Sequence, residues 1–316
     1  MISRRDHLKR SAAAGLGLIL PATVLRAAQH PQGLITRTIP GTGEKLPVVG
    51  LGSSASFARL AGEGDGAGVR AVVEALVRQG GTVFDTAPGY GAAEAVAARI
   101  AREQGLAPKL FWATKVNVAG YGGGTADVAA ARAQIERSIA LLGKSPMDLI
   151  QVHNLGDVPT QLGLLKDYQG AGRVRYIGVT TTMPDQYAEL ERIMRTEPLN
   201  FIGVDYAIDN RTVEERIFPL ARERGMAVLA YQPFGRTRLW RKVEGHALPA
   251  WAADYDIATW GQFFLKFVVS HPAVTAATPA TSQPKNVVDN LGAATGRLPD
   301  EAGRRRMAGY IEALAA

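Results

Sequence analysis

Short apolar runs alternate with stretches of helical periodicity from Leu46 to the end of the chain. Eight runs predict strands, because they are β-branched and apolar at most positions, as in strands buried on both faces. They lie at 48–53, 82–87, 110–116, 147–154, 174–181, 199–207, 226–234 and 274–280. Helical stretches separate them, for example 67–80, 125–143 and 213–225, and Gly80, Gly105, Gly143 and Gly225 stand where such helices would end.

Eight strand–helix units in one chain predict an α/β fold of the (β/α)8 TIM barrel type. The alternative is a doubly wound open sheet, whose first turn usually reads G-x-G-x-x-G. Here the first strand gives GLGSSAS, which lacks the third glycine at that spacing. Two short strands around a Gly-Thr-Gly turn at 34–49 predict a hairpin that closes the bottom of the barrel, and 301–316 predicts an extra terminal helix. The longest irregular segment is expected at 235–258, after the seventh strand.

Composition narrows the classes of function. The chain has 316 residues, 47% of them hydrophobic, and a formal net charge of +7. Residues 1–28 hold five basic residues and one acidic residue, so the remainder carries only +3 (+7 less +4), too little to indicate a nucleic-acid partner. There is no cysteine, and the five histidines show no metal-motif spacing, so no metal site is expected.

Residues 1–28 predict an export signal that precedes a single barrel domain at 34–316. A basic start is followed by an apolar stretch, 11–25, and then by small residues. The apolar stretch is too short to span a bilayer of about 30 Å, so no stable membrane span is expected. The adjacent Arg4 and Arg5 are typical of the twin-arginine signal, although His7 departs from it. We therefore expect the twin-arginine export machinery as a partner and a periplasmic or exported protein; an amphipathic helix or uncleaved anchor is the alternative.

Four polar residues follow or end consecutive strands, where a barrel carries its active site. They are Asp85, Tyr90, Lys115 and His153. A phenol is a poor acid near neutral pH, but an ammonium beside it favours its ionised form, and a carboxylate can hold that ammonium in place. An imidazole can donate a hydrogen bond to an oxygen that gains charge. The set suits protonation of a carbonyl oxygen, and because it contains no nucleophile or metal, a hydride would have to come from a cofactor. Taken singly, Asp85 could cap a turn, Tyr90 could be a packing aromatic and His153 a structural histidine. Lys115 is harder to explain structurally, because a buried lysine needs a partner.

Four segments in order resemble the aldo-keto reductase superfamily: FDTAPGYGAAE (84–94), WATKV (112–116), DLIQVHN (148–154) and VRYIGVTT (174–181). The resemblance runs from about Leu34 to Asn290. It implies that Tyr90 is the general acid, that Lys115, paired with Asp85, lowers the pKa of that phenol, and that His153 orients the carbonyl. The implied function is NAD(P)H-dependent reduction of a small-molecule aldehyde or ketone to an alcohol.

The resemblance also implies a nicotinamide dinucleotide that lies across the barrel mouth. Gly52, Ser53, Thr180 and Tyr231 would contact its nicotinamide part, with Tyr231 stacked on the ring. Gly235, Arg236 and Arg238 would cover the pyrophosphate, and Thr281, Asp289 and Asn290 would hold the adenosine end.

The chain departs from the family pattern at some cofactor positions. Thr181 and Gly203 stand where many members have the Asn and Gln that grip the carboxamide. Ala280 and Asn286 replace cations that recognise a 2′-phosphate, although Lys285 lies nearby. NADP(H) is favoured only because it is the usual cofactor of the family, and these departures keep NAD(H) as the alternative. Two other functions stay open: a non-catalytic nucleotide-binding or subunit protein on the same barrel, and an isomerase or lyase that uses no nicotinamide.

Overall fold

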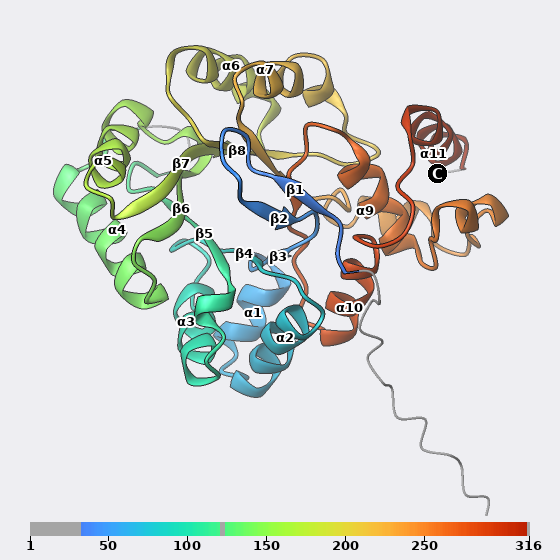
Figure 1. Cartoon of the computed structure of the whole chain (residues 1–316), viewed down its shortest axis with the longest axis horizontal. Coiled ribbons are helices and arrows are strands. Elements are labelled where there is room, and N and C mark those ends of the chain that lie inside the picture. The colour runs from blue at the N-terminus through green and yellow to red at the C-terminus, as the bar shows by residue number, and fades with distance from the viewer. Residues whose placement is uncertain (1–32, 121–123, 315–316) are drawn as a thin grey trace, which may run out of the picture.

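The computed structural model describes residues 33–120 and 124–314 as a barrel of parallel strands ringed by helices (Figure 1). The eight-stranded sheet runs in the order β10-β9-β8-β7-β6-β5-β4-β3. Its strands are β3 (Leu51–Gly52), β4 (Val83–Asp85), β5 (Phe111–Val116), β6 (Met147–Val152), β7 (Val174–Thr181), β8 (Phe201–Asp205), β9 (Ala227–Tyr231) and β10 (Ala276–Ala277). Parallel bridges from Val49 to Ala277 and from Gly52 to Ala280 join the first strand to the last. The sheet is therefore closed; the barrel prediction is confirmed and the open-sheet alternative is wrong.

Helices occupy the outside of the ring, as Figure 1 shows. They are α1 (Ser56–Gly62), α2 (Gly66–Arg78), α3 (Ala93–Glu103), α4 (Val128–Leu142), α5 (Val158–Gly170), α6 (Tyr187–Thr196), α7 (Ile217–Glu223), α8 (Arg238–Lys242), α9 (Trp260–Ser270), α10 (Pro284–Gly292) and α11 (Glu301–Ala313). The predicted helix at 213–225 is divided into a 3-10 turn, η4 (Thr212–Glu214), and α7. The four glycines expected to end helices all have positive φ, between 63° and 85°, the backbone region that favours glycine.

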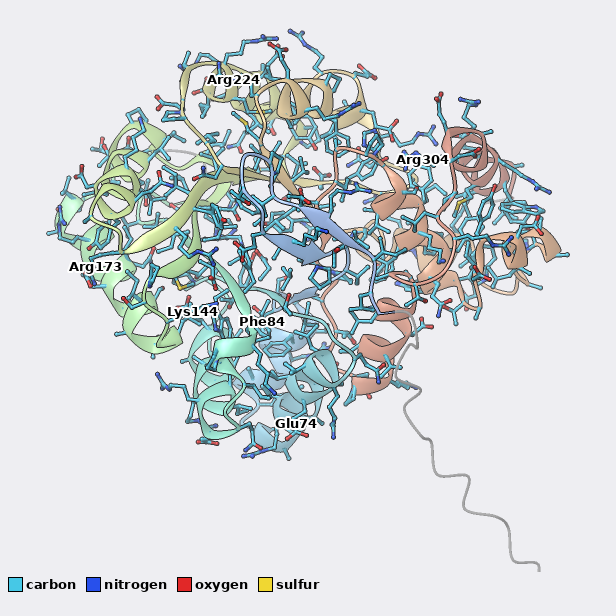
Figure 2. All side chains as sticks on the ribbon, viewed as in Figure 1. Glu74, Phe84, Lys144, Arg173, Arg224 and Arg304 are labelled. Atoms are coloured by element: carbon cyan, nitrogen blue, oxygen red, sulfur yellow. The ribbon has the colours of Figure 1, made fainter. Side chains whose placement is uncertain are left out.

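The larger apolar core lies between the strands and the helices. Phe84 on β4 is fully buried there, between Phe57 of α1 and Trp112 of β5, with ring centroids 5.5 and 4.9 Å away. Figure 2 shows Phe84 inside the ring, whereas Glu74 of α2 and Arg173 lie on its perimeter. The alternation of apolar strand and amphipathic helix thus fixes which face of each helix meets the sheet.

The predicted hairpin closes the bottom of the barrel. Strands β1 (Thr36–Thr38) and β2 (Lys45–Pro47) pair antiparallel and cross the centre of the ring (Figure 1). Ile39 and Leu46 are 1% and 2% exposed and join a second core cluster inside the barrel. That cluster includes the aromatic rings of Phe111, Tyr176 and Phe201, whose centroids lie 5.5–6.1 Å apart. The hairpin prediction is confirmed, and the barrel is a packed core at this end.

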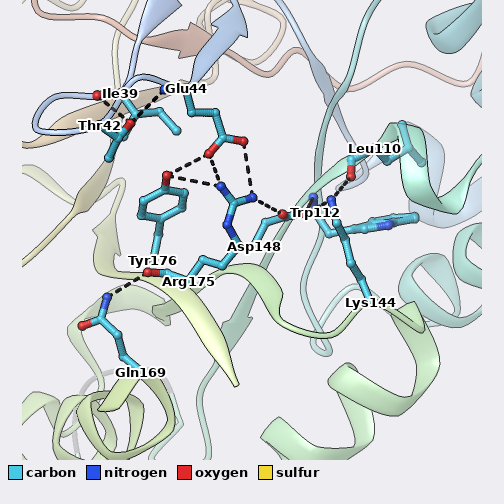
Figure 3. Close-up of polar contacts among 10 residues, drawn as sticks. All are labelled: Ile39, Thr42, Glu44, Leu110, Trp112, Lys144, Asp148, Gln169, Arg175 and Tyr176. Atoms are coloured by element: carbon cyan, nitrogen blue, oxygen red, sulfur yellow. Dashed lines mark hydrogen bonds and ion pairs between the residues drawn. The ribbon is translucent and has the colours of Figure 1, made fainter. Parts of the chain in front are cut away.

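A charged network holds the hairpin to the strands (Figure 3). The carboxylate of Glu44, in the hairpin, accepts hydrogen bonds from the guanidinium of Arg175 and, at 2.8 Å, from the hydroxyl of Tyr176. The same guanidinium donates to Asp148 Oδ1 at 2.8 Å, and Lys144 Nζ lies 2.7 Å from Asp148 Oδ2. The end of the barrel opposite the predicted active site is therefore fixed by charge as well as by packing.

The segment after β9 is more regular than its sequence indicates. It contains α8 and the 3-10 helix η5 (Ala250–Tyr255), so the expectation of one irregular stretch at 235–258 is wrong. Its tryptophans pack against α9 and α11: the ring of Trp251 lies 5.8 Å from Phe263 and 5.9 Å from Tyr310, and the ring of Trp240 lies 5.7 Å from Phe264. Aromatic packing, which a single sequence does not show, orders this segment. The predicted terminal helix is present as α11.

The predicted export signal, 1–28, lies outside the described residues. Within residues 33–120 and 124–314, no helix is both long and apolar enough to cross a bilayer.

Candidate active site

The strands carry their polar residues to one rim of the barrel. In the sheet register Asp85 pairs with Ala113, Lys115 with Gln151, and Asp205 with Tyr231. Because all eight strands are parallel, these carboxyl-terminal ends open on the same side, opposite the hairpin. The side chains of Asp85, Lys115, Gln151 and Tyr231 meet inside that mouth, as their contacts below show.

A buried ion pair lies at the centre of the mouth. Lys115 Nζ donates to both carboxylate oxygens of Asp85 at 2.9 Å and to the carbonyl oxygen of Thr86 at 2.8 Å. The two side chains are 1% and 4% exposed. Burial tends to lower the pKa of Lys115, but its interactions with Asp85 and Tyr90 together outweigh burial, so this pKa lies above its ordinary value. The expected pairing is present, and it places a fixed ammonium in a site of low dielectric.

Two phenols flank this ammonium at equal distance. The ring centroids of Tyr90 and Tyr231 each lie 5.3 Å from Lys115 Nζ. The Tyr231 hydroxyl lies 3.1 Å from Asp85 Oδ1 and 3.1 Å from Gln151 Oε1, and burial followed by the charge of Asp85 raises the pKa of Tyr231 well above its ordinary value. Tyr90 follows β4 on a turn and is only partly buried. Of the two, Tyr90 is the phenol that a substrate at the mouth could reach.

His153 lies beside Tyr90. Their ring centroids are 5.7 Å apart with the rings nearly perpendicular. Burial first, and the positive charge of Lys115 second, lower the pKa of His153 to about 3. The imidazole is therefore neutral near pH 7, with one nitrogen that can donate a hydrogen bond.

Strained backbone gathers at the same rim. Non-glycine residues with φ between 36° and 59° follow β3, β6 and β9: Ala55, Asn154, Leu155, Asp157, Gln232 and Arg236. Each such conformation costs free energy and persists only where surrounding structure enforces it, which is common at functional sites. The 3-10 turn η2 (His153–Leu155) owes its shape to this strain and sets the position of His153.

Several buried polar atoms at the rim lack a partner within the described residues. They include Ser53 Oγ, Asn154 Nδ2 and Thr278 Oγ1. A buried polar atom without a hydrogen bond costs about 1–3 kcal/mol, so their placement is consistent with contacts to a bound polar ligand. Ser53 was predicted from the sequence, but Asn154 and Thr278 were not. The only sequence signal for them is their position next to His153 and after the eighth strand.

The remaining predicted cofactor residues lie at the mouth with partners of their own. A Cβ on Gly52 would lie 2.5 Å from the carbonyl oxygen of Thr278, so this glycine is also required at the barrel seam. Thr180 Oγ1 accepts a hydrogen bond from the backbone N–H of Asn154 at 3.3 Å. Arg238 donates to Asp209 at 3.0 Å, close to Gly235.

The adenosine-end predictions fall around α10. Asp289 accepts hydrogen bonds from Thr259, the N-cap of α9, at 2.8 and 3.0 Å. Thr281 Oγ1 accepts from the backbone N–H of Gln283 at 3.1 Å, and Asn290 is 6% exposed. These contacts are structural, and cofactor binding by these residues stays a prediction. Arg236, with φ of 59°, lies on the exposed turn after β9.

Fold and mouth together define a class: a (β/α)8 barrel whose mouth brings together a half-buried phenol, a buried ammonium–carboxylate pair and a neutral imidazole. No group of acidic and histidine side chains that could hold a metal ion is present in the part of the chain that the structure describes. Residues 49–305 match the model of the aldo/keto reductase family. The chain belongs to the aldo/keto reductase family, and the expectation of an oxidoreductase of this class is confirmed.

Similarity to known proteins in sequence and in fold supports this assignment. The chain is 25% identical over 270 residues to a probable aldo-keto reductase 1 of Glycine max, a match that covers 73% of this chain and 75% of that protein. It is 27% identical over 202 residues to the aldo-keto reductase YhdN of Bacillus subtilis, with coverage of 61% and 60%. The fold is similar to that of an aldo-keto reductase from Klebsiella pneumoniae in complex with NADPH: the TM-score is 0.70 at 24% identity, with coverage of 87% and 95%.

Proposed function

We propose that this protein reduces an aldehyde or ketone to an alcohol with a hydride from NAD(P)H, and that Tyr90 is the general acid. The observation that carries the proposal is the buried Lys115–Asp85 pair directly behind a partly buried phenol. A buried lysine requires a compensating partner, and here the pair fixes an ammonium next to a phenol that is partly exposed at the mouth.

Each side chain has a distinct task. Lys115 stabilises negative charge on Tyr90 as its proton moves to the carbonyl oxygen, because the ammonium is fixed and poorly solvated. Asp85 holds that ammonium in place through both oxygens. His153 is neutral near pH 7, so it can donate a hydrogen bond to the carbonyl oxygen without competing as a proton donor.

A nicotinamide dinucleotide fits the mouth by its donor set. The buried unpartnered atoms of Ser53, Asn154 and Thr278 provide polar contacts at the rim. The residues proposed to hold the cofactor are Gly52, Ser53, Thr180, Tyr231, Gly235, Arg236, Arg238, Thr281, Asp289 and Asn290. When bound, the cofactor supplies the hydride that this chain lacks. The NADPH held by the Klebsiella protein supports NADP(H), and NAD(H) is the alternative because Ala280 and Asn286 replace the usual cations.

A non-catalytic nucleotide-binding or subunit protein is the second candidate function. Two departures favour it, since Thr181 and Gly203 replace residues that grip the carboxamide in many relatives. In the structure the Thr181 hydroxyl donates to Gln186. The two candidates differ in one measurable property, which is turnover.

Tyr90→Phe separates them. We expect purified parent protein to reduce members of a panel of aldehydes and ketones with NADPH, and the variant to lose about 10²–10⁴-fold in kcat, the usual contribution of a general acid. The dissociation constant for NADPH, from fluorescence titration, should change little. The matched control is Tyr310→Phe. Tyr310 is a partly buried residue of α11 that packs on Trp251, and it is not among the residues proposed for the site. Equal turnover in Tyr90→Phe and parent would refute the assigned acid, and NADPH binding without turnover by the parent would favour the non-catalytic candidate.

A further inference from the structure

The ring of Tyr231 occupies space that any side chain at position 203 would need. A Cβ built on Gly203 would lie 2.4 Å from Tyr231 Cε2 and 2.7 Å from its hydroxyl oxygen. Such distances are far inside van der Waals contact, so even alanine would force the ring to move. The glycine on β8 therefore permits the phenol of β9 to lie across the barrel interior.

In that position the Tyr231 hydroxyl reaches the acidic partner of the ion pair. It lies 3.1 Å from Asp85 Oδ1 and 3.1 Å from Oε1 of Gln151, a fully buried residue of β6. Gln151 Nε2 in turn lies 3.4 Å from the carbonyl oxygen of Val179. The hydroxyl has one proton, which it donates to the charged acceptor, Asp85, so a hydrogen-bonded chain runs from Tyr231 through Asp85 to Lys115 and joins three strands.

We infer that Tyr231 is a positioning residue for the proton-donating device: its hydroxyl holds Asp85 and disperses the negative charge of that carboxylate, in a space that Gly203 provides. This inference rests on the proposed function, because the device serves Tyr90. It gives Tyr231 a role besides the expected stacking on nicotinamide. It also gives a function to Gly203, which stands where many family members have glutamine: the glycine leaves room for the Tyr231 ring.

The charges around Lys115 explain the direction of the effect. The titratable groups near it are Asp85 on β4, Tyr90 on the following turn, Tyr231 on β9, His153 after β6, and Glu94 on α3. Of these, Tyr231 donates a hydrogen bond to the Asp85 carboxylate, which lessens its basicity. Without that donor the negative charge of the carboxylate is less dispersed, so it offsets more of the positive charge of Lys115 at Tyr90. Ionised Tyr90 is then stabilised less, so Tyr90 keeps its proton to a higher pH.

Tyr231→Phe tests the inference, since it removes the hydroxyl and keeps the ring. We expect the basic limb of the pH profile of kcat/KM to move up by about one pH unit, the size of effect that a hydrogen bond to a charged group has on titration. The NADPH dissociation constant should stay within about threefold, because phenylalanine can stack as tyrosine does. Gly203→Ala should produce the same upward shift by displacing the ring, and the double variant should shift no further than Tyr231→Phe alone. Gly309→Ala on α11, where a Cβ meets no atom within 4 Å, is the matched control.

A second measurement needs neither cofactor nor substrate. Phenolate absorbance in the ultraviolet, with folding followed by circular dichroism, gives the titration of Tyr90 as the difference between the parent and Tyr90→Phe. The same difference, taken in the Tyr231→Phe background, should titrate about one pH unit higher. If the parent reduces no carbonyl compound, the proposed function fails while this titration still decides the inference. Unshifted titration of Tyr90, or shifts in Gly203→Ala and Tyr231→Phe that add in the double variant, would overturn it.

Discussion

Burial assigns different roles to chemically identical residues in this site. Tyr90 and Tyr231 lie at the same distance from Lys115 Nζ, yet only Tyr90 combines that position with partial exposure at the mouth. Tyr231 donates inward to a carboxylate and holds its proton more tightly than an ordinary phenol. The spacing of FDTAPGYG predicts an acid and a phenol at one rim; the distinction between the two phenols depends on which one is desolvated.

His153 should give the stability of the fold a measurable pH dependence. The pKa of His153 in the folded state is about 3, below the ordinary 6.5, so between these pH values the imidazole is protonated in the unfolded chain and neutral in the native state. The contribution is full above pH 6.5 and is lost as pH falls toward 3, with a slope of up to about 1.4 kcal/mol per pH unit. His153→Gln should flatten the fall in unfolding free energy, measured by urea titration between pH 6.5 and 4. The exposed His246 provides the control His246→Gln, and an equal flattening in both variants would contradict the assignment.

At the scale of elements, the two ends of the described chain are attached to the barrel by charged side chains. The hairpin is held below by Glu44, and α11 is held at the side by Arg304. Arg304 is 8% exposed; it donates to Glu214 at 2.6 Å and contacts the Tyr206 hydroxyl, the Phe267 carbonyl and the Phe267 ring. Neither element contributes a side chain to the ion pair in the mouth, so changes here should alter stability more than turnover.

Arg304→Leu should lower the free energy of unfolding by about 3 kcal/mol, because it leaves Glu214 beside an apolar core without its cation. Urea denaturation followed by circular dichroism measures this. The neighbouring Arg305→Leu is the control: Arg305 is 67% exposed and pairs with Glu301 within one helix, so its loss should cost less than about 1 kcal/mol. Similar losses in the two variants would show that the buried contacts of Arg304 do not anchor α11.

Glu44→Gln should loosen the hairpin. The neutral amide cannot pair with Arg175 as the carboxylate does, so we expect a loss of about 1–2 kcal/mol in unfolding free energy. Glu63→Gln, at an exposed position, should stay within about 0.5 kcal/mol of the parent. Hydrogen exchange at the backbone amides of β1 and β2 localises the effect, and unchanged protection there would argue against a hairpin held by this network.

At the scale of the whole molecule, closure of the sheet collects residues that are far apart in the chain. Ser53, His153 and Thr278 reach one rim because each follows a parallel strand. A protein destined for twin-arginine export would fold in this way before it crosses the membrane, so a cofactor bound at the mouth could travel with it.

The proposed export signal can be tested on the whole chain. Residues 1–30 fused to a reporter protein should deliver it outside the bacterial cytoplasm, and the full protein should fractionate with the periplasm. Replacement of both arginines, by Arg4→Lys and Arg5→Lys, should retain the reporter inside, because that route reads the arginine pair. Delivery that is unchanged in the lysine variant would count against the twin-arginine route while leaving a general export signal open.

The sequence by itself determined the barrel, the hairpin below it and the four residues at the mouth. Strand and helix periods are local properties, glycines marked helix ends such as Gly143, and the four residues lie at or just after the ends of β4, β5 and β6. The ordered motifs added the family, which the match over 49–305 confirms.

Only the tertiary structure decided how those residues share charge. It ordered the segment after β9 through the packing of Trp240 and Trp251 on α9. It showed that Asn154 Nδ2 and Thr278 Oγ1 are buried without a partner among the described residues. It also placed Tyr231 against Gly203 and Asp85, three residues from three strands. The reason is physical: hydrogen bonding and desolvation depend on distances between side chains remote in sequence, and closure of the barrel sets those distances.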